Sequence, residues 1–540
     1  MNVRLQFNDS LMTERTGGAR RPGRKPAASR ARIGNRTQNW KRDNVMRRIM
    51  LVLLLLCGPS VGHAAGTLRI GLNEDPDALD PARSGSFVGR LVFAAVCDKL
   101  IDTDPNNAFV PQLATSWSWS PDNLALSITL RDGVTFQDGE RLDAEAAKVN
   151  LERYRSAPES LRKSELRPVS AVEVIDPKTI RLRLSQPYAP LIAALSDRAE
   201  MMVSPKGIAR LGPRLADELP CAGPFKLTER VAQDRIVVDR FPGYWDAASI
   251  KLDRVIYQPI PDTTVRLVNL KAGQLEMVER LGPTDAAAVK ADPRLRLIAE
   301  SALAYHTLAM NLVEGHALRD PVLREALEAS IDRGVLNQVV MDGQYIPSNQ
   351  FEAPGSRYYN PKRPVPPRDL ARAKALLAQS GTPHPAFTLT VDNQPVEMQA
   401  AQVIQSMANE AGFEVKIVAV EANALVAAGK AGTFDAMLVL WSGRVDPDGN
   451  VSIWLASDGF LNWGKYNSPK FDGILNKARA VTDVAERQAL YRDLSDVYLT
   501  DRPHIVLYHL KWLWALSDKV SGFVPTPDGL IRLRGVAVTP

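Results

Sequence analysis

The chain has 540 residues, a formal net charge of +6 and 45% hydrophobic residues. Its positive charge is concentrated at the amino-terminal end: residues 1–64 contain 13 Lys or Arg and 3 Asp or Glu, which leaves a net charge of −4 for the rest. This mildly acidic remainder lacks the basic excess that a nucleic-acid partner requires, and it is long enough for two or three domains with proper cores. We therefore expect a protein with no nucleic-acid partner.

The first element in chain order is a predicted secretory signal peptide at residues 46–64. Two arginines precede the unbroken apolar run 49–56, which Gly58-Pro59 and a small-residue end with Ala64 follow. This order of charged, apolar and small residues is typical of a signal peptide, and the run is shorter than the ~20 residues of a membrane-spanning helix. We predict cleavage after Ala64 and a mature protein in the periplasm. A retained membrane anchor is the alternative.

Residues 1–45 contain many Arg, Gly, Pro and Asn and show no apolar periodicity. We predict that they form a disordered basic extension. Since Met46 begins a complete signal peptide, Met46 is the candidate start of the protein, and an unusually long n-region is the alternative. A lipoprotein is disfavoured, because Leu56 and not a small residue precedes Cys57.

From residue 67 to about residue 305 the sequence predicts short strands, turns and few helices. Alternating apolar residues predict strands or hairpins at 68–72, 124–130, 172–184 and 235–240. Asp143 is expected to cap a helix that runs through Tyr154, and residues 88–97 are expected to form another helix.

Beyond residue 305 the predicted helices lengthen. Asp320 is expected to cap a helix that runs through Val340, and Asp369 a helix that Gly381 ends. The predicted strands at 387–391, 413–420 and 434–440 alternate with helices, and a helix at 484–499 precedes a strand at 504–516. The β-α-β-α-β order is typical of half of a doubly wound sheet.

These elements predict an α/β protein with two lobes. Residues 65–305 are expected to form lobe I, to which residues 511–540 return, and residues 306–510 are expected to form lobe II. A cleft between two lobes is the natural place for a ligand.

Two cysteines, Cys97 and Cys221, follow the predicted signal peptide. An oxidising compartment permits a disulfide between them, but two buried free thiols are also compatible with the sequence. Neither cysteine has a second cysteine or a histidine nearby, so we expect no structural zinc site and no cofactor.

Several short blocks follow one another in order from residue 67 to the C-terminus. They read LDP at 79–81, PQLATSW at 111–117, LRDGVTFQDG at 130–139, GPF at 223–225, LREAL at 323–327, SIDR at 330–333, DPDG at 446–449 and YNSP at 466–469. Together they resemble the extracellular solute-binding proteins of family 5, which serve peptide-, dipeptide- and nickel-type ABC importers. The resemblance implies a two-lobed type II periplasmic-binding-protein fold. It also implies a monomer that captures a peptide or peptide-like solute in the interlobe cleft and delivers it to permease subunits in the inner membrane.

The resemblance places the ligand beside the DPDG motif. One of its acids, Asp446 or Asp448, is expected to pair with the ligand's α-ammonium. An ordinary β-turn is the alternative. Trp441 is either a wall of the cleft or a core residue, and Ser442 and Gly443 permit close approach of the backbone.

A second segment, Ser84-Gly85-Ser86-Phe87, corresponds to small residues that line the cleft in the family. A loop that leads into the next helix is the alternative. Dipeptide binders carry an arginine for the ligand's carboxylate after the strand corresponding to 387–391, but residues 391–398 contain none, so Arg444 is the candidate replacement. The ligand remains open among dipeptides, longer peptides, glutathione, opines and other small solutes.

A secreted hydrolase is the rival class of function. After the predicted signal peptide the sequence contains no H-E-x-x-H motif and no G-x-S-x-G elbow, so we expect no enzymatic activity. A nickel-chelate or haem carrier of the same fold is the other alternative, with His306 near the lobe junction as its candidate ligand. A hydrogen-bonded structural histidine is the competing interpretation of His306.

Overall fold

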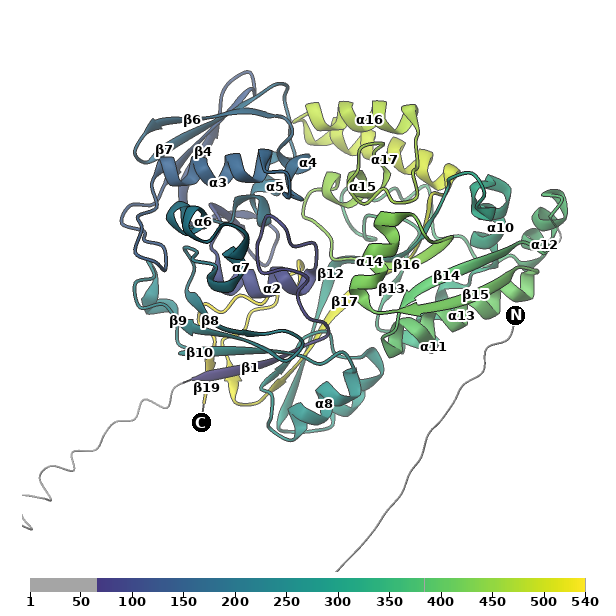
Figure 1. The fold of residues 1–540 in the computed structure, drawn as a ribbon. Coiled ribbons are helices and arrows are strands. Elements are labelled where there is room, and N and C mark those ends of the chain that lie inside the picture. Colours follow the sequence, from purple (N-terminus) through teal and green to yellow (C-terminus); the bar gives the residue numbers. More distant parts are fainter. Residues whose placement is uncertain (1–65, 383, 540) are drawn as a thin grey trace, which may run out of the picture. The chain divides into compact units, whose positions relative to one another are not determined.

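The structure is a computed structural model that describes residues 66–382 and 384–539 (Figure 1). The predicted extension at 1–45 and the predicted signal peptide at 46–64 lie outside the described residues. Within the described part of the chain, no helix has the length and apolar character that crossing a bilayer requires.

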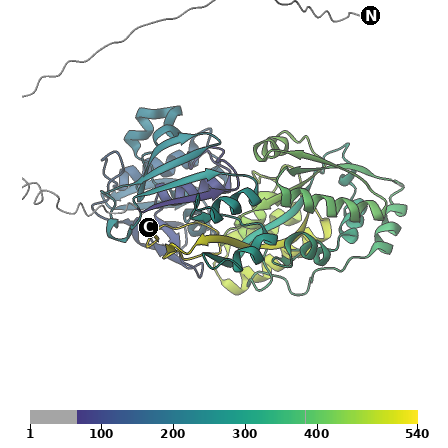
Figure 2. The same cartoon turned by 90° about the horizontal axis from the view of Figure 1, so that it is seen from below.

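One mixed sheet extends through both lobes (Figure 2). Its strands follow the order β15-β14-β16-β12-β17-β11-β1-β10-β9-β8, and β13 pairs with β17 beside this path. The strands are β1 (Thr67–Leu72), β8 (Phe225–Val231), β9 (Arg235–Arg240), β10 (Arg254–Pro259), β11 (Met277–Val278), β12 (Leu295–Met310), β13 (Ile346–Pro347), β14 (Ala386–Asp392), β15 (Glu414–Val420), β16 (Ala436–Trp441) and β17 (His504–Ser517).

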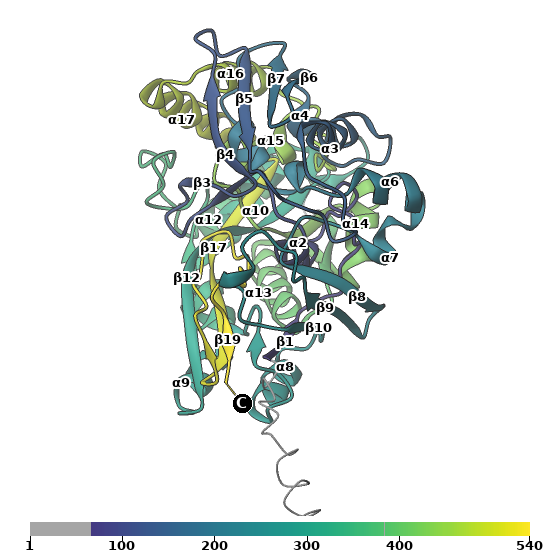
Figure 3. The same ribbon diagram turned by 90° about the vertical axis from the view of Figure 1, so that its left-hand side faces the viewer.

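Two long antiparallel strands, β12 and β17, connect the lobes (Figure 3). They pair from Leu295 opposite Ser517 to Ala309 opposite His504, with an irregularity between Ser301 and Tyr305. At one end β17 pairs with β11, and at the other end β12 pairs with β16. We place the boundary between lobe I (65–305 with 511–540) and lobe II (306–510) at this irregularity, as a proposal.

Lobe I contains a second, smaller sheet with its own hydrophobic core. Its order is β4-β5-β7-β6, and it packs against α3. The additional strands are β2 (Ile101–Thr103), β3 (Phe109–Pro111), β4 (Ala114–Trp119), β5 (Ala125–Leu130), β6 (Val169–Asp176) and β7 (Thr179–Leu184), and near the C-terminus β18 (Val520–Ser521) pairs with β19 (Ala537–Val538). The helices are α2 (Phe87–Val96), α3 (Ala144–Ser156), α4 (Lys163–Leu166), α5 (Leu191–Leu195), α6 (Pro205–Leu211), α7 (Leu215–Glu218), α8 (Thr263–Lys271) and α9 (Ala286–Lys290).

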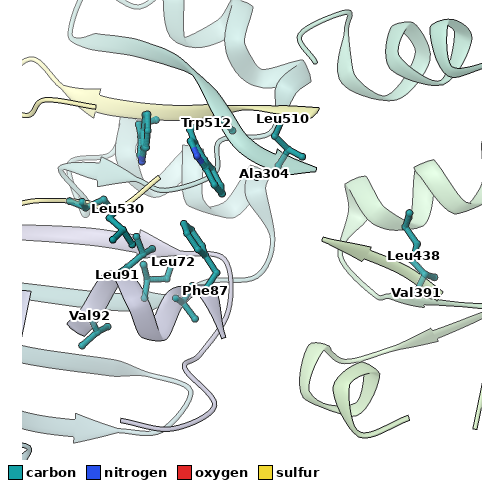
Figure 4. Packing of buried hydrophobic residues seen from close by; sticks show 14 of the residues in the cluster. Leu72, Phe87, Leu91, Val92, Ala304, Val391, Leu438, Leu510, Trp512 and Leu530 are labelled. Atoms are coloured by element: carbon teal, nitrogen blue, oxygen red, sulfur yellow. The ribbon is translucent and has the colours of Figure 1, made fainter. Parts of the chain in front are cut away.

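The α2 helix joins the beginning of the chain to its end. Phe87 stacks on Trp512 of β17 with ring centroids 4.8 Å apart, and Figure 4 shows these rings beside Leu72 and Leu530. At the other end of α2, Cys97 forms a disulfide with Cys221, their Cα atoms being 4.9 Å apart. The end of β17 therefore packs on α2, near the beginning of the described chain.

Lobe II is built on the parallel strands β15, β14 and β16. The chain moves outward from β14 to β15 through α13 and back to β16 through α14, so right-handed crossovers place α13 and α14 on opposite faces of the sheet (Figure 1). The helices are α10 (Pro321–Ser330), α11 (Arg333–Met341), α12 (Leu370–Gln379), α13 (Pro395–Ala411), α14 (Ala422–Ala431), α15 (Asp448–Leu455), α16 (Pro469–Ala480) and α17 (Val484–Asp501).

Acidic N-caps define several helix starts where the sequence predicts them. The carboxylates of Asp143, Asp320 and Asp369 each accept a backbone N–H of the first turn that follows. The single helix predicted from Asp320 through Val340 is wrong, because the chain leaves helical geometry at Ile331. Asp332 begins the next helix instead, since its carboxylate accepts the N–H of Val335 at 2.9 Å.

Candidate ligand-binding cleft

A cavity of about 640 Å³ lies between the two lobes. Carboxyl ends of parallel strands meet in it: Asn73 and Glu74 follow β1, Asp392 ends β14, and Trp441 ends β16. In open α/β sheets ligands bind beyond these strand ends, because the loops there carry side chains into a common crevice. The cavity is therefore the candidate ligand site.

The loop Ser84-Gly85-Ser86-Phe87 forms part of the cavity wall. Gly85, Ser86 and Phe87 line the cavity, whereas Ser84 is fully buried behind them. Asp77 fixes the loop, because its carboxylate accepts the Ser84 hydroxyl and the Gly85 N–H, each at 2.7 Å. Burial alone would raise the pKa of Asp77, but these hydrogen bonds outweigh burial and hold the pKa below its ordinary value.

The end of β16 forms another part of the wall. Trp441 and Ser442 line the cavity, and the Trp441 indole is buried and donates to Asn450 at 3.3 Å. The guanidinium carbon of Arg444 lies 4.3 Å from the centroid of this indole. Gly443 has a φ of +76°, and a Cβ there would lie 2.3 Å from the Cβ of Leu303, so a side chain at this position cannot be accommodated without movement.

The two acids of the DPDG motif are both paired with arginines of this chain. Both oxygens of Asp446 accept from Arg487 of α17 at 2.6 Å. Buried Asp448 accepts from Arg479 of α16 at 2.6 Å. The motif also begins α15, since the Asp446 carboxylate accepts the backbone N–H of Asp448 at 2.9 Å. Both acids line a smaller pocket beside Trp441, and their pairing with a ligand ammonium stays a prediction.

An arginine cluster, defined here as Arg90, Arg198 and Arg444 around Asp197, adjoins Ser442. The Nε of Arg90 lies 3.0 Å and that of Arg198 3.9 Å from one Asp197 oxygen, and the Nε of Arg444 lies 2.7 Å from the other. Burial opposes ionisation of Asp197, but the arginines, Arg444 first, hold its pKa well below the ordinary value. Three cations around one carboxylate leave an excess of positive charge, and Arg90 and Arg198 line the interlobe cavity.

Arg198 is the most deeply buried member of the arginine cluster, at 1% exposure. It donates to the carbonyl oxygens of Ser84 at 2.9 Å and Ser86 at 3.3 Å, while its Nε has no hydrogen-bond partner. Burial and the neighbouring arginines lower the pKa of Arg198 well below its ordinary value. A buried donor without a partner, beside uncompensated positive charge, favours an anionic group as ligand.

Sequence reasoning singled out Arg444 but missed Arg90, Asp197 and Arg198. The available signal was Arg90, a lone charge inside the apolar helix predicted at 88–97.

His306, the candidate metal ligand, is buried and its Nδ1 lies 2.8 Å from the Tyr508 hydroxyl. Among residues 66–382 and 384–539, no group of three His, Cys, Asp or Glu side chains has a geometry suited to a metal ion.

Sequence comparison finds relatives that match almost end to end. The glutathione-binding protein GsiB of Pectobacterium atrosepticum is 27% identical over 491 residues, which cover 88% of this chain and 95% of that protein. GsiB of Escherichia coli O1:K1 is 26% identical, over 87% of this chain and 94% of that protein. Both relatives are named as glutathione-binding proteins.

Structure comparison confirms the predicted two-lobed periplasmic-binding-protein fold. The periplasmic binding protein DppA of Helicobacter pylori, in complex with the peptide STSA, superposes with a TM-score of 0.81 at 24% identity over 88% of this chain and 98% of that chain. AgaA of A. tumefaciens R10, in complex with agropinic acid, also has a TM-score of 0.81, at 25% identity over 88% and 99%. NikA of Staphylococcus aureus, in complex with Ni(L-His)2, has a TM-score of 0.79 at 22% identity over 88% and 100%.

The family comparison agrees with the resemblance in the sequence blocks. The model of bacterial extracellular solute-binding proteins, family 5, matches residues 108–462, which is more than half of the chain. This match includes the small sheet of lobe I, the crossing strand β12 and the DPDG motif. The chain therefore belongs to the bacterial extracellular solute-binding proteins of family 5.

Proposed function

We propose that this protein is the periplasmic substrate-binding component of an ABC importer and that its solute is a peptide or a peptide-like molecule with a free carboxylate. The observation that carries the proposal is the excess of positive charge at the arginine cluster in the interlobe cleft. A carboxylate there would accept charge-assisted hydrogen bonds in a site with few competing waters. Relatives named for binding glutathione, a peptide and agropinic acid support this class of ligand.

The proposed site comprises the segments that the sequence predicts as ligand-binding and that also line the interlobe cavity. We propose that Gly85, Ser86 and Phe87 contact the solute from lobe I, and Trp441 and Ser442 from lobe II. Ser84 and Gly443 would support these segments, since Ser84 is buried and Gly443 packs on β12. Arg444 connects the lobes through Asp197, so a carboxylate at this point would also favour closure.

Export and delivery complete the proposal. We propose that the signal peptide at 46–64 directs the chain to the periplasm, where the protein acts as a monomer and docks on permease subunits of the inner membrane. N-terminal sequencing of the protein from a periplasmic extract is expected to begin at or near Ala65. Recovery of the intact chain with the membrane fraction would contradict this step.

The test of the ligand class is calorimetry with a defined panel: dialanine, trialanine, glutathione, agropinic acid and nickel with L-histidine. We expect at least one solute with a free carboxylate to bind, and its amidated form to bind ten- to a hundredfold more weakly, about 1.4–2.8 kcal/mol. Arg444→Gln should cause a similar loss and remove the sensitivity to amidation. Arg372→Gln, which changes an exposed arginine of α12, is the control with the same loss of charge.

Two results would contradict this ligand class. Binding of nickel with L-histidine alone would favour the nickel-chelate alternative. Equal affinity for free and amidated forms, in both the parent protein and Arg444→Gln, would show that the arginine cluster does not receive the ligand.

A further inference from the structure

A second charged group lines the same cavity and has the opposite sign. We define the Glu74 group as Glu74, Asp392, Glu397 and His306, all of which line the interlobe cavity. Glu74 follows β1 in lobe I, Asp392 ends β14, and Glu397 lies in the first turn of α13 in lobe II. The group therefore spans both lobes.

The lobes already touch beside this group. The side-chain amide of Asn73, next to Glu74, donates to the side chain of Gln394 at 3.4 Å, and Gln394 donates to Asp392 at 3.2 Å. A solute held by the Glu74 group would therefore contact lobe I and lobe II at once.

The carboxylates of the group carry more negative charge than the nearby arginine compensates. Arg280 contacts Glu74 at 3.5 Å, but its shorter contact, 2.5 Å, is with Glu279, which lies outside the group. Burial raises the pKa of Glu74 to about 7, that of Asp392 to about 6 and that of Glu397 to about 7. Repulsion from neighbouring acids adds to the rise at Glu74 and Asp392, and Arg280 opposes the rise at all three.

His306 does not supply the missing positive charge. Its ring is 3% exposed, and burial, with a smaller contribution from Arg280, lowers its pKa to about 3, so the imidazole is neutral. Its Nδ1 is occupied by the Tyr508 hydroxyl, whereas its Nε2 lies 3.4 Å from Glu397 without a hydrogen-bond partner. A buried ring nitrogen that has no hydrogen-bond partner and lies next to the Glu397 carboxylate is an independent indication that a ligand group binds here.

The geometry favours an organic cation over a metal ion. Among the described residues no three His, Cys, Asp or Glu side chains are arranged to hold a metal ion, and this includes the side chains of the Glu74 group. A primary ammonium has three N–H donors on a compact charge and can be shared among several carboxylates that are too widely spaced for a metal.

We propose that the Glu74 group binds the cationic end of the solute, a primary ammonium, while the arginine cluster binds its carboxylate. This inference rests on the proposed function and adds to it the orientation of the solute. Arg90 and Arg198 of the arginine cluster line the same cavity as the Glu74 group, so one zwitterionic molecule can contact both groups. The proposal differs from pairing of the ammonium with Asp446 or Asp448, whose carboxylates are held by Arg487 and Arg479.

The test compares glutathione and trialanine with their N-acetylated forms by calorimetry, on the full-length mature protein. In the parent protein, acetylation is expected to lower the affinity at least tenfold. Asp392→Asn and Glu397→Gln are each expected to lower the affinity for the free amine at least tenfold and to remove most of the difference between free and acetylated probe. A variant that only disturbed the fold would weaken binding of the free and the acetylated probe alike, so it would keep the difference in affinity between them.

Matched variants separate the two hypotheses. Glu410→Gln removes an exposed carboxylate from the same helix, α13, and should behave as the parent protein. Asp446→Asn should retain the sensitivity to acetylation. Thermal denaturation should show that Asp392→Asn and Glu397→Gln melt no lower than the parent protein, because each removes an uncompensated charge.

The outcomes distinguish the inference from the proposed function. If the parent protein binds a free-amine probe but acetylation makes no difference, the ammonium site is overturned and the peptide-like ligand stands. If sensitivity to acetylation disappears in Asp446→Asn and persists in both Glu74-group variants, the ammonium lies at the DPDG motif instead. If neither glutathione nor trialanine binds the parent protein but another solute of the panel with a free carboxylate does, the ammonium site is overturned and the proposed function stands. If no solute of the panel with a free carboxylate binds, the proposed function fails as well.

Discussion

At the scale of single residues, the sequence identified cleft positions that lie within continuous motifs and missed those assembled from distant segments. Trp441 and Ser442 follow a recognisable strand and line the cavity. Arg90, Asp197 and Arg198 come from α2 and from the turn after α5, and no short motif unites them. The partners of Asp446 and Asp448 lie on helices that begin 20 or more residues later, so the sequence could not show that these acids are already paired.

A pH-dependent stability effect is expected at Glu397. The pKa of this carboxyl is raised from an ordinary 4.5 to about 7, so the folded protein binds the proton more tightly than the unfolded chain does. The contribution of Glu397 to the free energy of unfolding therefore increases as the pH falls from 8 toward 5. In the solute-free protein, Glu397→Gln should raise the free energy of unfolding at pH 8 by on the order of 1–3 kcal/mol, and the difference should largely disappear at pH 5.

Urea denaturation at the two pH values measures the effect of Glu397→Gln, with Glu410→Gln as the matched control on α13. The control removes an exposed, paired carboxylate and should change little between pH 8 and pH 5. If the free energies of unfolding of Glu397→Gln and the parent protein differ by the same amount at pH 8 and pH 5, the Glu397 carboxyl has an ordinary pKa in the folded protein.

At the scale of elements, the sequence predicted nine of the nineteen strands in the described part of the chain and missed others, including β8, β10 and the crossing strand β12. Its wrong helix boundary has a local cause. The strand expected at 235–240 has those bounds, and Asp143 and Asp369 cap helices as predicted. The apolar spacing after Asp320 continues across Ile331, so periodicity alone could not show that Asp332 offers its carboxylate to a new helix start. A side-chain cap overrides a continuous apolar pattern, because the chain gains a backbone partner by breaking there.

The contact between β16 and β12 is expected to require a glycine at position 443. Gly443→Ala would place a methyl group 2.3 Å from Leu303 at a φ of +76°, so it should lower the free energy of unfolding by about 1–3 kcal/mol. It should also weaken solute binding, because Ser442 and Arg444 are its neighbours. Gly473→Ala is the control: Gly473 lies in α16 with open space around it, and alanine there should be neutral or stabilising by up to about 1 kcal/mol.

Thermal denaturation of Gly443→Ala and Gly473→Ala, with calorimetry on the same probe solute, measures both effects. Equal melting temperatures for the two variants would contradict the role of Gly443 in fixing the end of β16.

At the scale of the whole described unit, polar contacts join the lobes around the cleft, and one hydrophobic core contains residues of both lobes. Arg90 donates to Ser442 at 3.1 Å, and Arg444 lies 2.7 Å from Asp197. The two chain segments that connect the lobes are β12 and β17, and these strands pair along almost their full length. The sequence predicted two lobes and a returning tail, but which charges face one another across the cleft depends on side chains from both lobes and could be seen only in the folded chain.

Closure by hinge bending is expected to accompany binding. The lobes are joined by two paired strands with an irregularity between Ser301 and Tyr305. A bend there would change the cleft width and leave intact both the core of the small sheet in lobe I and the core around α15, α16 and α17 in lobe II. Uncompensated positive charge at the arginine cluster and negative charge at the Glu74 group disfavour the closed arrangement until a zwitterionic solute neutralises both, so a larger share of solute-free molecules should be open.

Small-angle scattering should then give a smaller radius of gyration with solute than without it. At a solute concentration of 100 times the Kd, binding should also stabilise the protein by about 2.7 kcal/mol, visible as a higher melting temperature. Glu397→Gln should narrow the difference in radius between solute-free and solute-bound protein, because it removes part of the charge that keeps the lobes apart. A solute that raises the melting temperature of the parent protein with no change in radius would show that the cleft is closed before binding.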